Sequence, residues 1–148
     1  MPLKSGSPIP ELEGATEWFN GTVTKDDLAG GIALIYFWAL SCHICKENMP
    51  VLREWVRDYT PKGVRFVSIH MPRQESDTHI ADVKSAIENL GITEPVAIDN
   101  DHTIGERFET TGFWPYYFIF DKEGAMRGRA AGHAGLKTIE NTLKRLIE

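Results

Sequence analysis

The chain has 148 residues, enough for a substantial core, and we expect residues 1–148 to form one domain. Hydrophobic residues make up 42% and charged residues 25%, and the net charge of −5 argues against a nucleic-acid or anionic-membrane surface. The longest apolar run is about half as long as a membrane-spanning helix needs, and residues 1–20 hold no stretch that resembles a secretory signal. We therefore expect a cytoplasmic protein that binds neither nucleic acid nor membrane.

The first part of the chain predicts an arm and two small local elements. Residues 1–16 contain three prolines and predict an extended N-terminal arm. Asn20 and Gly21 lie between two short segments of strand-forming residues, and Asn-Gly is a strong hairpin signal, so we expect a β-hairpin there. Residues 25–28 predict one helical turn, closed by the glycines at 30–31.

A central strand and a long helix are predicted next. Residues 32–38 are apolar at every position, which is typical of a strand covered by helices on both faces. Apolar residues then recur at helical spacing from Met49 to Tyr59, which predicts an amphipathic helix. Pro50 should kink this helix, and residues 61–63 should end it.

The next segment predicts a second strand, a helix and a third strand. Residues 64–71 indicate another buried strand, followed by a polar loop in which Asp77 or Thr78 would cap the coming helix. Residues 80–90 have the periodicity of that helix, and residues 96–98 indicate a short strand.

The last third predicts a short helix, a hairpin and a closing helix. Residues 103–108 indicate the short helix, and the strands at 116–120 and 125–131 are joined by a tight turn at 121–124. Residues 136–147 carry apolar side chains on one helical face. Strands that alternate with helices before a final hairpin and helix predict an α/β sandwich with a mixed sheet.

The two cysteines of the chain, Cys42 and Cys45, lie three residues apart at the junction of the central strand and the long helix. Unpaired N–H groups and the helix dipole favour negative charge at a helix N-terminus, and the thiolate is the nucleophilic form of cysteine. Cys45, one turn further on, is placed to attack a mixed disulfide formed by Cys42. The spacing therefore predicts a redox-active CxxC disulfide bond.

Three other readings of this pair are less well supported. A structural zinc site needs four ligands, and the chain has no further cysteine. A c-type haem site needs histidine where Lys46 stands, and a peroxidase needs a cysteine outside the pair. A metal carrier that uses Cys42, Cys45 and His43 remains the alternative, and it predicts stoichiometric bound zinc or copper.

The element order and the motif resemble the thioredoxin fold from about residue 32 onward. Cys42 and Cys45 match the disulfide of that family, Pro50 matches its helix-kinking proline, and Pro115 matches its cis-proline. The resemblance implies a thioredoxin-like three-layer α/β/α sandwich with a mixed central sheet, here with an N-terminal extension.

Further segments resemble a particular branch. The inserted helix–strand unit at about residues 72–101 is similar to that of the TlpA/ResA-type proteins, and residues 18–21, 41–47, 70–73 and 120–122 look like those of cytoplasmic YkuV-type thiol–disulfide oxidoreductases. The resemblance implies a monomeric enzyme of cell redox homeostasis that reduces disulfide-containing proteins and needs no cofactor. An upstream dithiol or flavin reductase would supply its electrons, because no nucleotide-binding motif is present.

Four residues around the cysteines are expected to tune them or to contact substrate. His43 would stabilise the Cys42 thiolate, Trp38 and Trp114 would sense the disulfide, and Trp114 would also face substrate. Pro115, if cis, would position the Trp114 backbone for an extended substrate and keep metals from the sulfurs. If His43 raises the potential strongly, the protein would instead be an oxidant or isomerase.

The chain also departs from the family pattern. Ser41 replaces the usual tryptophan before the first cysteine, and Tyr36 stands where thioredoxin has a buried aspartate. Asn48 replaces the active-site glutamate of the ResA type, and we expect Glu47 and Asn48 to lie on the helix surface. Neither family pattern therefore supplies the group that takes the proton of Cys45.

The remaining aromatic and histidine residues receive no functional role from the sequence. Phe113 is expected in the core, and no role is assigned to the remaining histidines: His70, His79, His102 and His133.

Overall fold

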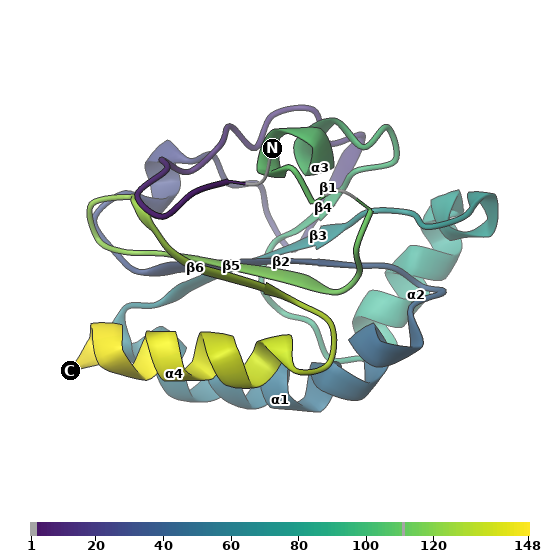
Figure 1. Cartoon of the computed structure of the whole chain (residues 1–148). Coiled ribbons are helices and arrows are strands. Elements are labelled where there is room, and N and C mark those ends of the chain that lie inside the picture. Colours follow the sequence, from purple (N-terminus) through teal and green to yellow (C-terminus); the bar gives the residue numbers. More distant parts are fainter. Residues whose placement is uncertain (1–2, 111) are drawn as a thin grey trace.

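The computed structural model describes residues 3–110 and 112–148, so Pro2 of the predicted arm and Thr111, four residues before Pro115, lie outside the described residues. A six-stranded mixed sheet forms the middle layer, in the order β1-β4-β3-β2-β5-β6 (Figure 1). Its strands are β1 (Glu17–Phe19), β2 (Ala33–Trp38), β3 (Arg65–His70), β4 (Val96–Ile98), β5 (Tyr116–Phe120) and β6 (Met126–Ala131). The helices are α1 (His43–Tyr59), α2 (Ile80–Asn89), α3 (Thr103–Phe108) and α4 (Gly135–Ile147), with 3-10 turns η1 (Asp26–Leu28), η2 (Thr60–Lys62) and η3 (Glu75–Thr78).

Each face of the sheet carries its own hydrophobic core. Helices α1, α2 and α4 cover one face, where Leu52, Ile87 and Ile139 pack on the sheet (Figure 1). The other face is covered by α3, η1 and the N-terminal arm, through buried residues such as Leu12 and Phe108. These layers form the predicted thioredoxin-like α/β/α sandwich with a mixed sheet.

The central strand β2 determines where the cysteines lie. It runs parallel to β3 and antiparallel to β5, and all of its side chains are buried. Because Trp38 at its end pairs with His70 at the end of β3, the chain segments that follow both strands leave the sheet at the same edge. The residues that follow His70 are thereby brought beside Cys42.

The elements predicted from residue 32 onward are present. Helix α1 starts six residues earlier than its apolar pattern, at His43, because Cys42 occupies its N-cap. Pro50 lies inside the helix, and Gly63, with a φ of +92°, ends the η2 turn that follows it. No helix within residues 3–110 or 112–148 combines the length and the apolar character that crossing a bilayer requires.

The predicted hairpin at Asn20 and Gly21 is wrong. Asn20 does adopt a left-handed turn conformation, with a φ of +62°, but residues 21–24 form no strand. Instead β1 pairs antiparallel with β4, and the Asn20 side chain donates hydrogen bonds to the carbonyls of Ile92 (2.9 Å) and Glu94 (3.1 Å). Pairing with a distant strand therefore replaced pairing across the local turn.

The predicted cap of α2 is also wrong. His79 occupies the N-cap position, and no side chain caps the helix there. Thr78 donates its hydroxyl to the Glu75 carbonyl, and Asp77 is buried within η3, where its carboxylate faces another part of the chain.

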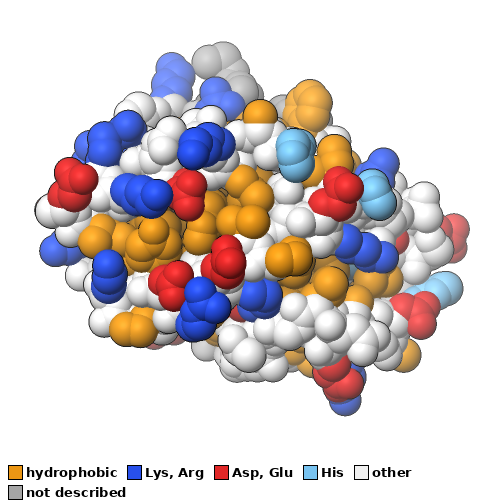
Figure 2. All heavy atoms as spheres, turned by 90° about the horizontal axis from the view of Figure 1, so that it is seen from below, with side chains coloured by type: hydrophobic (Ala, Val, Ile, Leu, Met, Phe, Trp, Pro, Cys, Tyr) orange, Lys and Arg blue, Asp and Glu red, His pale blue; other side chains and the backbone are white. Residues whose placement is uncertain are grey.

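The surface formed by α1 and α4 does not carry charge of a single sign. Figure 2 views the molecule from this side, and Lys and Arg side chains are interspersed there with Asp and Glu and with patches of apolar side chains. Leu136, Leu146 and Ile147 of α4 are only partly buried against the core beneath.

Candidate active site at Cys42 and Cys45

Cys42 and Cys45 form a disulfide at the start of α1. Their Cα atoms lie 5.3 Å apart, and Cys42 Sγ accepts a hydrogen bond from the Cys45 N–H at 3.1 Å. This contact makes Cys42 the N-cap of the helix, where unpaired N–H groups converge and favour negative charge on its sulfur. Both residues are buried, with 4% and 2% of their surface exposed.

A surface hollow of about 510 Å³ opens beside Cys42. Phe113 at its rim is 59% exposed, so its predicted place in the core is wrong. Trp114 is half-buried, and its indole N–H donates to the Met71 carbonyl at 2.7 Å, which fixes the ring beside the hollow. The residues that line the hollow are Ser41, Cys42, His43, Ile44, Arg73, Gly112, Phe113 and Trp114.

The peptide bond between Trp114 and Pro115 is cis. Pro115 is buried, and its carbonyl accepts the Gly132 N–H at 2.9 Å, next to the start of β5. The segment from Gly112 to Trp114, just before this bond, lines the hollow together with the start of α1.

His43 and Trp38 lie in contrasting places. The side chain of His43 is 86% exposed, and its Nε2 lies 3.3 Å from Glu47 Oε2 on the outer face of α1. Trp38 is fully buried, donates to Ser68 Oγ at 2.7 Å and packs edge-on against the His70 ring, with the ring centres 4.7 Å apart. Trp38 belongs to the same buried cluster of hydrophobic side chains as Cys42 and Cys45, and its expected role as a sensor of the disulfide stays a prediction.

His70, to which no role was assigned, supports the loop that leads to Cys42. Its Nε2 accepts the Leu40 N–H at 3.1 Å, so the ring is neutral, with its proton on Nδ1. Burial lowers the pKa of His70 to about 4, which keeps it neutral at physiological pH.

Asp77 also binds this loop. Its carboxylate accepts the Ser41 N–H (3.1 Å), the Ser41 hydroxyl (2.7 Å) and the Arg73 N–H (3.0 Å). Burial opposes its ionisation, but the hydrogen bonds from Ser41 and from the backbone of Arg73 and Gln74 outweigh it and lower the pKa of Asp77. Sequence analysis missed this contact, and the serine in place of the family tryptophan was the one local sign of it.

A second polar cluster lies beneath α1, and it includes Asn48, which was expected on the helix surface. Asn48 is buried rather than exposed, and it donates to the Tyr117 hydroxyl at 2.7 Å. Tyr36 donates to the buried Glu94 at 2.8 Å, and Arg53 donates to both oxygens of that carboxylate at 2.6 Å. Burial and then the charge of Glu94 raise the pKa of Tyr36 well above its ordinary value, so its hydroxyl stays protonated.

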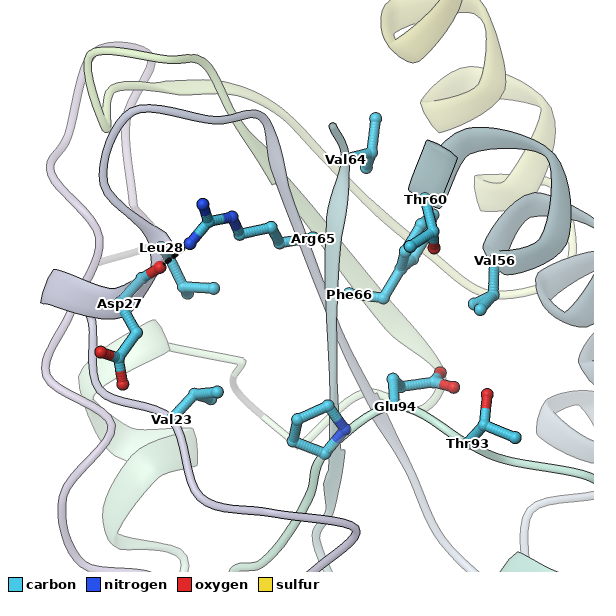
Figure 3. A pocket seen from close by; sticks show the side chains of 11 residues that line it. Val23, Asp27, Leu28, Val56, Thr60, Val64, Arg65, Phe66, Thr93 and Glu94 are labelled. Atoms are coloured by element: carbon cyan, nitrogen blue, oxygen red, sulfur yellow. Dashed lines mark hydrogen bonds between the residues drawn. The ribbon is translucent and has the colours of Figure 1, made fainter. Parts of the chain in front are cut away.

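A separate cavity of about 370 Å³ lies toward the other end of β3, between η1 and the end of α1 (Figure 3). Most of its lining is apolar, as at Leu28 and Phe66, and the Arg65 guanidinium beside it donates to the Asp27 carbonyl. Neither cysteine lines this cavity, so the thiol chemistry belongs to the hollow at Cys42. The described residues contain no group of three or more His, Cys, Asp or Glu side chains placed to hold a metal ion.

Comparisons with known proteins agree with this site. The thiol-disulfide oxidoreductase YkuV of Bacillus subtilis (strain 168) is 39% identical, over 98% of this chain and 97% of that protein. The thiol-disulfide oxidoreductase ResA of the same organism is 23% identical, over 82% of this chain and 64% of its own length. A solved thioredoxin-like protein in its oxidised form superposes with a TM-score of 0.90 at 38% identity, covering 98% of this chain and 97% of its own. Residues 5–129 match the AhpC/TSA family, and the chain therefore belongs to that family.

Proposed function

We propose that this chain is a thiol–disulfide oxidoreductase, acting as a single domain, which reduces protein disulfides through Cys42 and Cys45. The observation that carries the proposal is the disulfide between the N-cap of α1 and the next turn, beside an open hollow. The family and the 39% identity to a thiol-disulfide oxidoreductase support the same chemistry.

The reaction follows from the positions of the two sulfurs. In the reduced protein the Cys42 thiolate attacks one sulfur of the substrate disulfide, whose S–S bond breaks and whose other sulfur leaves as a thiolate. Cys45 then loses its proton and attacks Cys42 Sγ in the mixed disulfide, which releases the second substrate thiolate. Two electrons pass to the substrate, and the Cys42–Cys45 disulfide is left. The Cys45 N–H, which donates to Cys42 Sγ in the oxidised protein, would stabilise the attacking thiolate.

The segment around Pro115 is proposed to hold the substrate. Trp114 and the exposed Phe113 flank the hollow, and an extended substrate segment would lie along the backbone before Pro115. His43, exposed at the helix start, and Trp38, through His70, are proposed to tune the cysteines. The carrier alternative gains no support, because no cluster of metal-binding side chains surrounds the two sulfurs in the described residues.

The proposal includes a cellular setting. A chain whose only two cysteines form a redox pair suits a reducing compartment such as the cytoplasm, where structural disulfides are rare. The protein would act as a monomer on disulfide-containing proteins, and an upstream dithiol or flavin reductase would return it to the reduced form.

Replacing Cys45 with serine should trap the substrate. Cys42 can still attack, but no thiol is left to resolve the mixed disulfide, so a covalent adduct through Cys42 should accumulate. The measurement is mass spectrometry of the Cys45→Ser protein after incubation with a disulfide-containing protein such as insulin. Cys42→Ser serves as the control and should form at most a trace of adduct. If wild type reduces the substrate but Cys45→Ser forms no adduct, the assigned order of attack is wrong.

The reduction potential should be that of a reductase. Equilibration with defined thiol–disulfide buffers, followed by tryptophan fluorescence, should give a value of about −270 mV, close to that of thioredoxin. Trp38 shares a buried cluster with both cysteines and Trp114 lines the hollow beside Cys42, so both should report the state of the disulfide. A value of about −120 to −180 mV would contradict the reducing direction and make the protein an oxidant or isomerase.

A further inference from the structure

The residue directly before the nucleophile is held at three points by a single loop. Asp77 accepts both the N–H and the hydroxyl of Ser41, at 3.1 and 2.7 Å. Arg73 donates its guanidinium to the Ser41 carbonyl at 2.7 Å, and its own N–H binds Asp77 at 3.0 Å. Together Arg73 and Asp77 form what we term the Ser41 clamp.

The clamp needs a carboxylate at position 77. One oxygen of Asp77 accepts the Ser41 N–H, and the other accepts the Ser41 hydroxyl and the Arg73 N–H. An asparagine amide has one oxygen and one NH2 group, so in either orientation a backbone N–H of Ser41 or Arg73 would face another donor. The Ser41 hydroxyl could rotate and accept a hydrogen bond from the amide NH2, but a backbone N–H can only donate. Asp77 is 1% exposed, so water cannot readily replace the lost acceptor.

The two members of the clamp carry opposite charges on opposite sides of Ser41. Asp77 lies in the interior, whereas Arg73 is exposed and lines the same hollow as Cys42. Among the described residues that line this hollow, Arg73 alone has a permanent charge. Other titratable groups near Cys42 are His43, Lys46 and Glu47 in the first two turns of α1, and His70 at the end of β3. His102 packs against Trp114 on the other side of the hollow's lining.

We propose that Asp77 and Arg73 are positioning residues for the Cys42 nucleophile, and that their opposite charges tune its reactivity in opposite directions. This inference rests on the proposed function, because it concerns the same nucleophile. The clamp keeps the backbone that leads into Cys42 in one conformation while the disulfide opens and closes. Arg73 favours the thiolate from the solvent side, and the Asp77 charge opposes it from the interior.

The test is the pH dependence of Cys42 alkylation by iodoacetamide, measured in the Cys45→Ser background so that a single thiol reacts. Arg73→Ala should raise the midpoint pH by about half a unit, and Asp77→Asn should lower it by about as much. Arg73→Lys, which keeps the charge, should restore most of the wild-type midpoint. With Cys45 present, Asp77→Asn should also slow reduction of insulin disulfides about 10-fold, because the attacking sulfur is no longer held in place.

Control substitutions lie away from the hollow, after β5 and near the end of α1. Asp121 accepts the backbone N–H groups of Glu123 and Ala125 through one oxygen, at the end of β5 distant from Cys42. Asp121→Asn therefore removes a carboxylate charge there without touching the site. Arg57→Ala removes an exposed arginine near the other end of α1. Neither control should move the alkylation midpoint.

Shifts of the same sign for Arg73→Ala and Asp77→Asn, or shifts no larger than those of the controls, would overturn the proposal. If Asp77→Asn does not fold, the Arg73→Ala variant alone tests whether charge shifts the alkylation midpoint of Cys42. An unchanged midpoint in Arg73→Ala then rejects the charge effect. If wild-type protein fails to reduce any disulfide, the proposed function fails, whereas the alkylation midpoints still decide whether the clamp acts on Cys42.

Discussion

Replacing Glu94 with alanine is expected to lower the free energy of unfolding by about 3–5 kcal/mol, the cost of breaking a buried charge pair from one side. The Glu94 side chain is 4% exposed and that of Arg53 is 19% exposed, and two hydrogen bonds of 2.6 Å join them. The same carboxylate accepts the hydroxyl of the fully buried Tyr36. Its removal leaves a cation and a hydroxyl without their carboxylate acceptor between α1 and the sheet. Arg53 then keeps only longer hydrogen bonds, to the Gly91 carbonyl at 3.2 Å and to the Tyr36 hydroxyl at 3.1 Å.

Urea unfolding followed by circular dichroism measures this loss, with the slope of the transition checked for change. Glu94→Gln keeps the shape and one acceptor oxygen and should lose less than Glu94→Ala. Glu88→Ala removes an exposed carboxylate from neighbouring α2 and should leave the transition in place. A Glu94→Ala protein as stable as Glu88→Ala would show that the pair contributes nothing to folding.

Stability should also fall steeply in mild acid because of His70. Its pKa is about 4 in the folded protein, against an ordinary value of about 6.5 in the unfolded chain. Between these values the unfolded state binds the proton and the folded state does not, so the free energy of unfolding rises with pH in this range. The contribution of His70 is fully present above about pH 6.5 and is lost as the pH falls to about 4, on the order of 3 kcal/mol in total.

His70→Gln isolates this effect, since the amide can still accept the Leu40 N–H but does not titrate between pH 4 and 7. Unfolding measured at several pH values should give a much shallower acid slope for His70→Gln than for wild type. His133→Gln, at an exposed position, should keep the wild-type slope. If the free energy of unfolding varies with pH in the same way for wild type and His70→Gln, the pKa of His70 is not lowered in the folded protein.

Asp77 affects stability at lower pH than His70 does. Because its pKa is lowered in the folded protein, its contribution to the free energy of unfolding is lost only as the pH falls below about 4.

The parts of the fold that sequence predicts well are those with local or strongly patterned signals. Strand β2 is a continuous apolar run because both of its faces are buried, and α1 shows its stripe because one face packs on the sheet. The cysteine pair is equally local, because three residues of helix bring Cys45 back to Cys42. The spacing of the two cysteines along a helix is enough to predict that they lie close together.

The missed features all depend on polar contacts between distant residues. Asp77 precedes a helix and therefore has the local sign of an N-cap, yet its partner is Ser41, 36 residues earlier. Glu94 meets Tyr36 across 58 residues, and no periodicity marks either as a partner. The turn conformation predicted at Asn20 is present, but the strand that pairs with β1 is the distant β4, which the local sequence does not indicate. Which distant polar groups meet depends on sheet order and register, and a single sequence does not specify these through its local pattern.

The pairing of β1 with β4 also constrains the order in which the protein assembles on the ribosome. Thr16, beside β1, bonds to Ile98, 82 residues further on, and Pro8 in the arm bridges to Ala125. The N-terminal segment is therefore synthesised well before the strands with which its backbone pairs. Strands β2 and β3, with α1 between them, can form earlier, because their contacts span a shorter length of chain. The edge of the sheet that comes first in the sequence is thus among the last parts to close during synthesis.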